Sequence, residues 1–294
     1  MSRPKATIRR EQAPVREELV PAAGVELAAR QTGQPDAPAV VVLHGALGTR
    51  DHVLLGSTRL QDAGFRVVAY DARGHGQSSG PPGPEGYTYD LWLADLLAVL
   101  DAFEVDRGLF LGASLGAHTA LRLAMEDPDR VAGIVAATPS YDPDVHPPAE
   151  PVRKADRLAA GLRSGGVEGF IEALEPEPAW GRRAEALRQV LALRMRQHAN
   201  LDAVADALEA VWRAVPFGPL ADLRRVTAPV AVVGSLDDYD ADHPYELAAR
   251  YADVLPASSF ACERDGKLPM AWSGGALAAQ VLEVAERAGI APAG

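Results

Sequence analysis

Cysteine and lysine are both scarce in this sequence of 294 residues. A single cysteine, Cys262, excludes an internal disulfide and a multi-cysteine zinc site, and it favours a reducing compartment. Of the 29 basic residues only three are lysine, namely Lys5, Lys154 and Lys267, and the rest are arginine. The formal net charge of −11 argues against a nucleic-acid partner, because no excess of cations is available to replace the counterions of a phosphate backbone.

Long apolar runs are absent as well. No stretch approaches the roughly 20 apolar residues that a membrane span needs. Residues 1–17 are polar and lack the apolar segment of a signal peptide. We therefore expect a cytoplasmic protein with no membrane partner, in which residues 1–17 form a poorly packed lead-in.

Short apolar runs alternate with longer amphipathic segments along most of the chain. Such runs are typical of parallel strands buried on both faces, and they lie at Ala39–Leu43, Phe65–Tyr70, Gly108–Leu111, Ile134–Ala137 and Val230–Val233. We place the last strand at Ser258–Cys262. Helical patterns fall between them, at Tyr89–Phe103, Leu115–Met125 and Glu246–Leu255. This alternation predicts an α/β fold with a mostly parallel central sheet flanked by helices.

One region breaks this alternation. Residues 141–222 contain no strand candidate, and Ala, Leu and Arg dominate four helical stretches at Val152–Arg163, Val167–Leu174, Arg182–His198 and Leu201–Val215. We predict that residues 141–222 form a helical cap. The cap would be inserted between two parts of one core, residues 1–140 and 223–294.

A Gly-x-Ser-x-Gly sequence at residues 112–116 lies between a strand candidate and a helical pattern. A sharp strand-to-helix turn leaves no room for side chains at Gly112 and Gly116, and it exposes the hydroxyl of Ser114. The helix that follows would present the Leu115 N–H near its positive end, where an oxyanion can be stabilised. The motif therefore predicts a nucleophilic serine.

With this motif the sequence resembles the α/β-hydrolase superfamily, and within it the capped serine esterases and lactonases, from about residue 18 to 288. Three more segments resemble the family, namely Leu43-His44-Gly45-Ala46-Leu47-Gly48, Asp71-Ala72-Arg73-Gly74-His75-Gly76-Gln77-Ser78 and Val233-Gly234-Ser235-Leu236-Asp237. The resemblance implies that the Ala46 N–H is the second oxyanion donor and that His44 and His75 brace loops. It also implies that Asp237 is the acid of a catalytic triad, although the choice among the aspartates of residues 237–242 stays open. Epoxide hydrolases and haloalkane dehalogenases are disfavoured, because those relatives use an aspartate where this chain has Ser114.

The base of the triad is the main departure from the family. The family's histidine follows the last strand, but residues 265–269 read Asp-Gly-Lys-Leu-Pro, so Lys267 occupies that position. A lysine with a pKa of about 10.4 is only about 0.04% neutral at pH 7, and lowering that pKa to 7 requires about 4.6 kcal/mol. Because a surface cation in this chain is usually arginine, and only lysine can lose its proton when buried, we predict that Lys267 is the base.

His243 is a rival base. The aspartate-rich loop at residues 237–243 is about three residues longer than the usual acid loop of the family, and this extra length can bring His243 toward Ser114. These aspartates lack the glycine and the terminal glutamate of an EF-hand, so we predict neither a metal nor a cofactor.

These residues predict a serine hydrolase acting on small or medium apolar carboxylic esters, with a small-molecule substrate as its partner. Ser114 would attack, Asp237 would orient Lys267 or His243, and cap aromatic residues would line the pocket, with Phe170, Trp180, Trp212 and Phe217 as candidates. The alternative is a protein of the same fold that does not hydrolyse esters, either a ligand-binding protein or a lyase without a cofactor. The missing histidine motivates this alternative.

Overall fold

A single sheet forms the centre of the protein, whose computed structural model describes residues 14–174, 181, 183–236, 240–262 and 272–293. Its strands are β1 (Val15–Ala22), β2 (Val25–Thr32), β3 (Ala39–Leu43), β4 (Arg66–Tyr70), β5 (Gly108–Ala113), β6 (Val131–Ala137), β7 (Val230–Val233) and β8 (Ser258–Ala261). They lie in the order β1-β2-β4-β3-β5-β6-β7-β8. β1 and β2 are antiparallel to their neighbours and all other pairs are parallel, which confirms the predicted mostly parallel sheet.

The hairpin of β1 and β2 was not predicted. The expected lead-in of residues 1–17 overlaps it, since β1 begins at Val15. β1 is an edge strand in which only Val20 is buried, and Val15 and Leu19 are 62% and 55% exposed. One face of β1 lies in water and the other is only partly covered, so the strand carries no apolar run and its sequence resembles a solvated charged segment.

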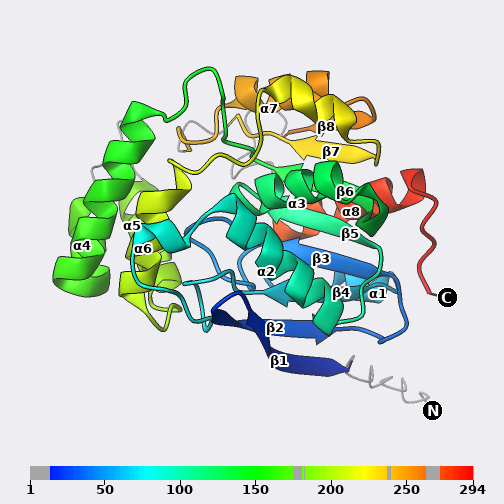
Figure 1. Ribbon diagram of the computed structural model, residues 1–294, viewed down its shortest axis with the longest axis horizontal. Coiled ribbons are helices and arrows are strands. Elements are labelled where there is room, and N and C mark those ends of the chain that lie inside the picture. Colours follow the sequence, from blue (N-terminus) through cyan, green and yellow to red (C-terminus); the bar gives the residue numbers. More distant parts are fainter. Residues whose placement is uncertain (1–13, 175–180, 182, 237–239, 263–271, 294) are drawn as a thin grey trace, which may run out of the picture.

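Helices cover both faces of the sheet (Figure 1). One face packs against α2 (Tyr89–Ala102), α3 (Leu115–Glu126) and α7 (Tyr245–Val254), and the other packs against α1 (Arg59–Asp62) and α8 (Gly274–Arg287). Successive side chains of the strand β3 point to opposite faces of the sheet. Val41 lies in the core beneath α2, α3 and α7, and Val40 and Val42 lie in the core beneath α1 and α8. Burial on both faces is therefore the reason why its sequence is apolar at every position.

Three further helices lie together on one side of the sheet, and we call α4 (Ala149–Ala173), α5 (Ala184–Met195) and α6 (Leu201–Val211) the cap helices (Figure 1). They share a separate apolar core that includes Phe170, Met195 and Leu208. Gly166, at φ 60° and ψ −140°, interrupts α4 between the two helical stretches that the sequence predicts there. Ala46 and Leu47 pack against this core, so the cap helices rest on the loop after β3.

The remaining elements of the described residues are short 3₁₀ helices at η1 (Pro84–Gly86), η2 (Pro128–Arg130) and η4 (Leu220–Arg225). Among the helices of the described residues, none has both the length and the apolar character needed to span a membrane.

The loops after β3, β5, β6 and β7 leave the sheet at its carboxyl edge, because these four strands are parallel. In an open parallel sheet this edge is where ligands bind. The cap helices extend from the loop after β6, so they are connected to the chain at the same edge.

Candidate active site

Ser114 occupies a strained turn between β5 and α3. Its φ of 49° and ψ of −109° lie in a region that side-chain-bearing residues rarely adopt. A Cβ on Gly112 would lie 2.3 Å from the Gly116 carbonyl oxygen, and one on Gly116 would lie 2.4 Å from the Leu43 carbonyl oxygen. Both glycines of the motif are therefore required by close backbone contacts, as the sequence predicts.

Substituting Gly116 with alanine tests this contact. The new methyl group would meet the backbone of β3, which cannot move without shifting the sheet, so we expect the free energy of unfolding to fall by about 2–3 kcal/mol. Urea denaturation measures the change. Gly275→Ala is the matched control, because a Cβ there meets no atom within 4 Å, and an unfolding free energy equally lowered in both variants would contradict the prediction.

His243 and Asp240 complete a hydrogen-bonded chain with Ser114. The Ser114 Oγ lies 2.9 Å from His243 Nε2, and His243 Nδ1 lies 2.7 Å from Asp240 Oδ1. Because an ionised carboxylate only accepts hydrogen bonds, Nδ1 carries the proton and Nε2 accepts the hydrogen bond from the serine hydroxyl. The chain has the order and the geometry that proton transfer from a serine requires.

The charges around this chain favour a basic imidazole. Burial of the His243 ring disfavours its protonated form, but the charge and the hydrogen bond of Asp240 outweigh burial and raise the pKa of His243. Burial also disfavours the Asp240 carboxylate, yet His243, Lys154 and Arg194 together hold the pKa of Asp240 below its ordinary value. Asp240 is therefore ionised at neutral pH and able to orient the ring.

Two of the predicted site residues, Asp237 and Lys267, lie outside the described residues. The structure brings together Ser114 and the rival base His243, and it adds Asp240, which the sequence left open among the aspartates of residues 237–242. The available signal was the spacing of Asp240 and His243. His243 lies three positions after Asp240, and in a turn this spacing lets the two side chains meet.

The loop after β3 lies directly against the serine turn. A Cβ at Gly45 would lie 3.6 Å from the Cβ of Ser114, in ordinary van der Waals contact. The Gly45 carbonyl accepts hydrogen bonds from His44 Nδ1 at 2.8 Å and from the Gly48 N–H at 2.9 Å. Since the carbonyl and the N–H of a trans peptide point in opposite directions, these bonds also fix the direction of the Ala46 N–H.

Leu115 is the first residue of α3, so its N–H has no intrahelical acceptor. Both Ala46 and Leu115 line the same cavity as Ser114. Two backbone N–H groups, one from the loop after β3 and one from the start of α3, therefore belong to residues of the cavity that contains Ser114.

Three other histidines, two from the motifs and His118 from α3, brace the surrounding loops. His44 Nε2 accepts a hydrogen bond from the Ala72 N–H, and the ring of His75 lies between the carbonyl oxygens of Arg73 and Ala46, 2.9 Å from each. His118 Nε2 accepts from the N–H groups of Ser140 and Tyr141, and burial lowers the pKa of His118 to about 3. These three rings are buried and occupied by backbone contacts.

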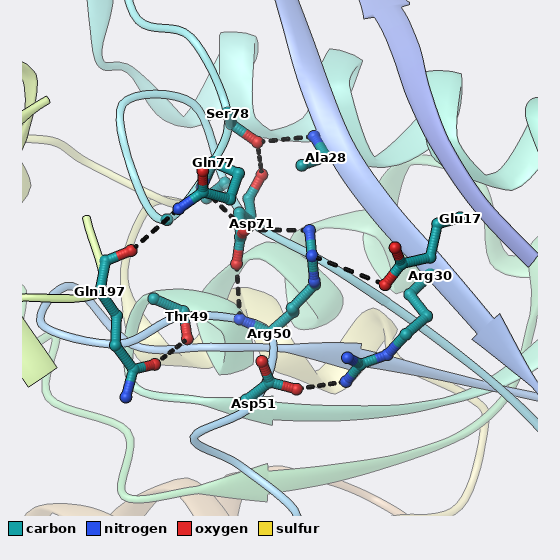
Figure 2. A network of polar contacts seen from close by, with 12 residues as sticks. Glu17, Ala28, Arg30, Thr49, Arg50, Asp51, Asp71, Gln77, Ser78 and Gln197 are labelled. Atoms are coloured by element: carbon teal, nitrogen blue, oxygen red, sulfur yellow. Dashed lines mark hydrogen bonds and ion pairs between the residues drawn. The ribbon is translucent and has the colours of Figure 1, made fainter. Parts of the chain in front are cut away.

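A polar network holds the loop after β3 to its neighbours, and Figure 2 shows Asp71 at its centre. Asp71 accepts hydrogen bonds from the backbone N–H groups of Arg50 at 2.7 Å and Gln77 at 3.0 Å. Gln197, between α5 and α6, extends the network to the cap helices through Thr49 and Gln77 (Figure 2). This network therefore joins core loops to the segment between two cap helices.

A cavity of about 480 Å³ opens onto Ser114 beneath the cap helices. Its wall is largely apolar and includes Leu158, Leu187, Leu208, Val211, Trp212 and Trp272. Of the predicted wall aromatics, Trp212 lines the cavity, whereas Phe170 and Phe217 are buried in the two adjoining cores, and Trp180 lies outside the described residues. Within the described part of the chain, no group of three or more His, Cys, Asp and Glu side chains is placed to hold a metal ion.

Comparison with known proteins identifies the family of this chain. Residues 38–217, more than half of the chain, match the alpha/beta hydrolase fold family. Epoxide hydrolase A of Mycobacterium tuberculosis is 34% identical over 209 residues, which cover 55% of this chain and 63% of that protein. The chain thus spans less than two thirds of that relative.

Solved structures are similar over most of the chain. A hydrolase from Pseudomonas aeruginosa has a TM-score of 0.65 and 27% identity, with 83% of this chain and 89% of that chain covered. A thermophilic esterase from Thermogutta terrifontis has a TM-score of 0.66 over 83% of this chain and 88% of its own, and at 24% identity this likeness concerns the fold alone. Together with the serine turn and its sheet, the family match shows that this chain belongs to the α/β-hydrolase family.

Proposed function

We propose that the protein is a serine hydrolase of carboxylic esters, with Ser114 as the nucleophile, His243 as the general base and Asp240 as the residue that orients the base. The observation that carries this proposal is the 2.9 Å distance between His243 Nε2 and Ser114 Oγ. It lies within the range needed for direct proton transfer. The predicted roles of Lys267 and Asp237 remain the competing hypothesis.

In the first step the Ser114 oxygen attacks the ester carbonyl while His243 Nε2 takes the hydroxyl proton. The Ala46 and Leu115 N–H groups stabilise the negative charge that forms on the carbonyl oxygen. His243 then donates its proton to the leaving alkoxide, and an acyl group remains on Ser114. The Asp240 carboxylate stabilises the imidazolium that exists between these two transfers.

In the second step a water molecule replaces the alcohol. His243 takes a proton from the water, whose oxygen attacks the acyl carbonyl, and the same two N–H groups stabilise the new oxyanion. Collapse of this intermediate releases the carboxylic acid, and the proton returns from His243 to Ser114. The covalent step thus turns one difficult hydrolysis into two easier ones.

The chemistry of serine favours esters over epoxides, although one similar protein is an epoxide hydrolase. A serine oxygen that opens an epoxide forms an ether, which has no carbonyl for water to attack, so the enzyme would remain alkylated. A serine that attacks an ester forms another ester, which water can cleave. The nucleophile therefore supports acyl transfer as the reaction.

The cavity supports a small or medium substrate with an apolar portion. A volume of about 480 Å³ lies in the range of small-molecule sites. We infer that residues 141–222 act as the cap predicted from the sequence, because the cap helices supply Leu158, Leu187, Leu208 and Trp212 to the wall. Esters with short or medium acyl chains fit this lining.

Labelling with a fluorophosphonate probe tests the proposal. We expect one probe per chain on Ser114, no labelling of Ser114→Ala, and labelling of His243→Gln that is slower by orders of magnitude, because the probe reacts with an activated serine. Intact-protein and peptide mass spectrometry give the stoichiometry and the site. A wild-type protein that neither reacts with the probe nor cleaves p-nitrophenyl butyrate would support the non-hydrolysing alternative instead.

A further inference from the structure

The cavity wall contains a cation for which the ester-cleaving groups have no direct use. Arg194 lies near the end of α5 and lines the cavity together with Leu187, Val190 and Leu191 of the same helix. These four residues have the spacing i, i+3, i+4 and i+7, so they share one face of the helix. Arg194 is therefore a charged residue on the apolar, cavity-facing side of α5.

Arg194 has no partner within the chain as described. No hydrogen bond or ion pair joins its guanidinium to a described residue, although 16 ion pairs join other arginine and lysine side chains to carboxylates within the described residues. Burial lowers the pKa of Arg194, and the more distant charge of Asp240 partly opposes this shift. An unpaired cation in an apolar wall is costly, and an anionic ligand group would remove that cost.

The carboxylates that line the cavity are already engaged elsewhere. Asp240 accepts from His243, Asp242 pairs with Lys154 at 2.8 Å, and Asp142 pairs with Arg250 at 2.6 Å. None of the three lies within ion-pair distance of Arg194 in the described structure. The acidic groups of the wall thus leave the guanidinium available to a bound molecule.

His52 lines the same cavity as Arg194 and offers a second donor. Its Nδ1 accepts a hydrogen bond from the Thr49 N–H at 2.9 Å, so the proton of the neutral ring is on Nε2. Burial and the nearby positive charge of Arg194 lower the pKa of His52 to about 4, so the ring is neutral at pH 7. Both side chains line the cavity, where a planar guanidinium and an imidazole N–H can together bind a carboxylate.

We propose that Arg194, with His52, binds a carboxylate at the far end of the substrate's acyl chain, so that the preferred substrates are monoesters of dicarboxylic acids. This inference rests on the proposed ester hydrolysis for its assignment to the acyl chain. The acyl group stays attached to Ser114 through both steps while the alcohol leaves after the first. A charge anchor on the acyl side therefore orients the reacting carbonyl in acylation and in deacylation.

A matched pair of esters tests the preference. Mono-p-nitrophenyl adipate and p-nitrophenyl hexanoate have acyl chains of six carbons and differ in a terminal carboxylate. We expect wild type to have the higher kcat/KM for the adipate ester, and Arg194→Gln to lower the ratio of the two kcat/KM values by about 10–100-fold, chiefly through the KM of the adipate ester. Arg194→Lys should keep part of the preference, since it retains the charge but not the planar fork.

Arg196→Gln is the matched control. Arg196 follows α5 by one residue, pairs with Glu168 at the surface and is not among the residues that line the cavity. Its replacement removes one positive charge at nearly the same position in the chain and should leave the ratio within about twofold of wild type. A purely structural role of Arg194 would lower both kcat/KM values together, and an unchanged ratio in Arg194→Gln would overturn the inference.

Calorimetry separates this inference from the proposed hydrolysis. We expect Ser114→Ala to bind intact mono-p-nitrophenyl adipate, and Ser114→Ala/Arg194→Gln to bind it at least tenfold more weakly. Binding that depends on Arg194, in a protein that cleaves neither ester, would support the carboxylate site and refute the hydrolysis. Cleavage of both esters with no dependence on Arg194 in rate or binding would refute the carboxylate site alone.

Discussion

Replacing His243 with glutamine is expected to lower kcat/KM for p-nitrophenyl butyrate by about 10⁴-fold or more, to nearly the level of Ser114→Ala. Glutamine fills a similar volume and can still contact Ser114, but it cannot accept the serine proton at neutral pH. The nucleophile then remains a neutral hydroxyl, and the two oxyanion donors supply only residual catalysis. Steady-state rates and the unfolding midpoint of the variant should be measured together, so that lost activity is distinguished from lost folding.

Lys267→Met is the comparison that decides between the two candidate bases. If His243 is the base, this variant should keep wild-type kcat/KM within about threefold. The opposite pattern, with Lys267→Met inactive and His243→Gln active, would support Lys267 as the base, as predicted from the sequence. The experiment needs no information about the position of Lys267, because it compares rates alone.

Asp240→Asn should reduce kcat by about 10³–10⁴-fold, the second largest effect that we expect. The amide can no longer fix the proton on His243 Nδ1 or stabilise the imidazolium formed during the reaction. Asp237→Asn is the matched control, since it changes the other candidate acid of the same loop. A larger loss in Asp237→Asn than in Asp240→Asn would contradict the role of Asp240.

The pH dependence of the same variant gives an independent readout. In the wild type Asp240 raises the pKa of His243, and only the neutral ring accepts a proton, so activity should rise with pH through a value above the ordinary 6.5. Without the carboxylate, burial becomes the main influence and lowers that pKa. The acid limb of the kcat/KM profile should therefore move to lower pH in Asp240→Asn, and an unmoved limb would show that another group titrates there.

The sheet could be predicted largely from the sequence, because burial on both faces leaves a direct record in composition. Every residue of β3 and β7 is buried, and their sequences are apolar throughout. The hairpin of β1 and β2 left no such record, since hydrogen bonds to β4 place it and its outer strand faces water. The sequence of β1, VREELVPA, therefore resembles that of a charged surface segment.

Part of the candidate site could likewise be predicted from the sequence, and part could not. The serine turn could be predicted because its two glycines are required by close backbone contacts. Gly112 contacts Gly116 within the turn, and Gly116 contacts Leu43 of the neighbouring strand β3. For the partner of Ser114 the sequence offered two candidates, Lys267 and His243, and could not decide between them, because the choice depends on how a loop more than a hundred residues away folds back over the sheet. The order of residues in the family favoured Lys267, whereas three-dimensional proximity favours His243.

Asp240 and His243 are neighbours along the chain as well as in space, and this has a consequence for assembly of the site. Joining two groups three residues apart closes a very short loop, so the entropy lost in bringing them together is small. Ser114 is 129 residues from His243, and only that closure is of high contact order. The acid and base can therefore pair locally as soon as their loop forms, and the chain needs a single long-range closure rather than two to assemble all three groups.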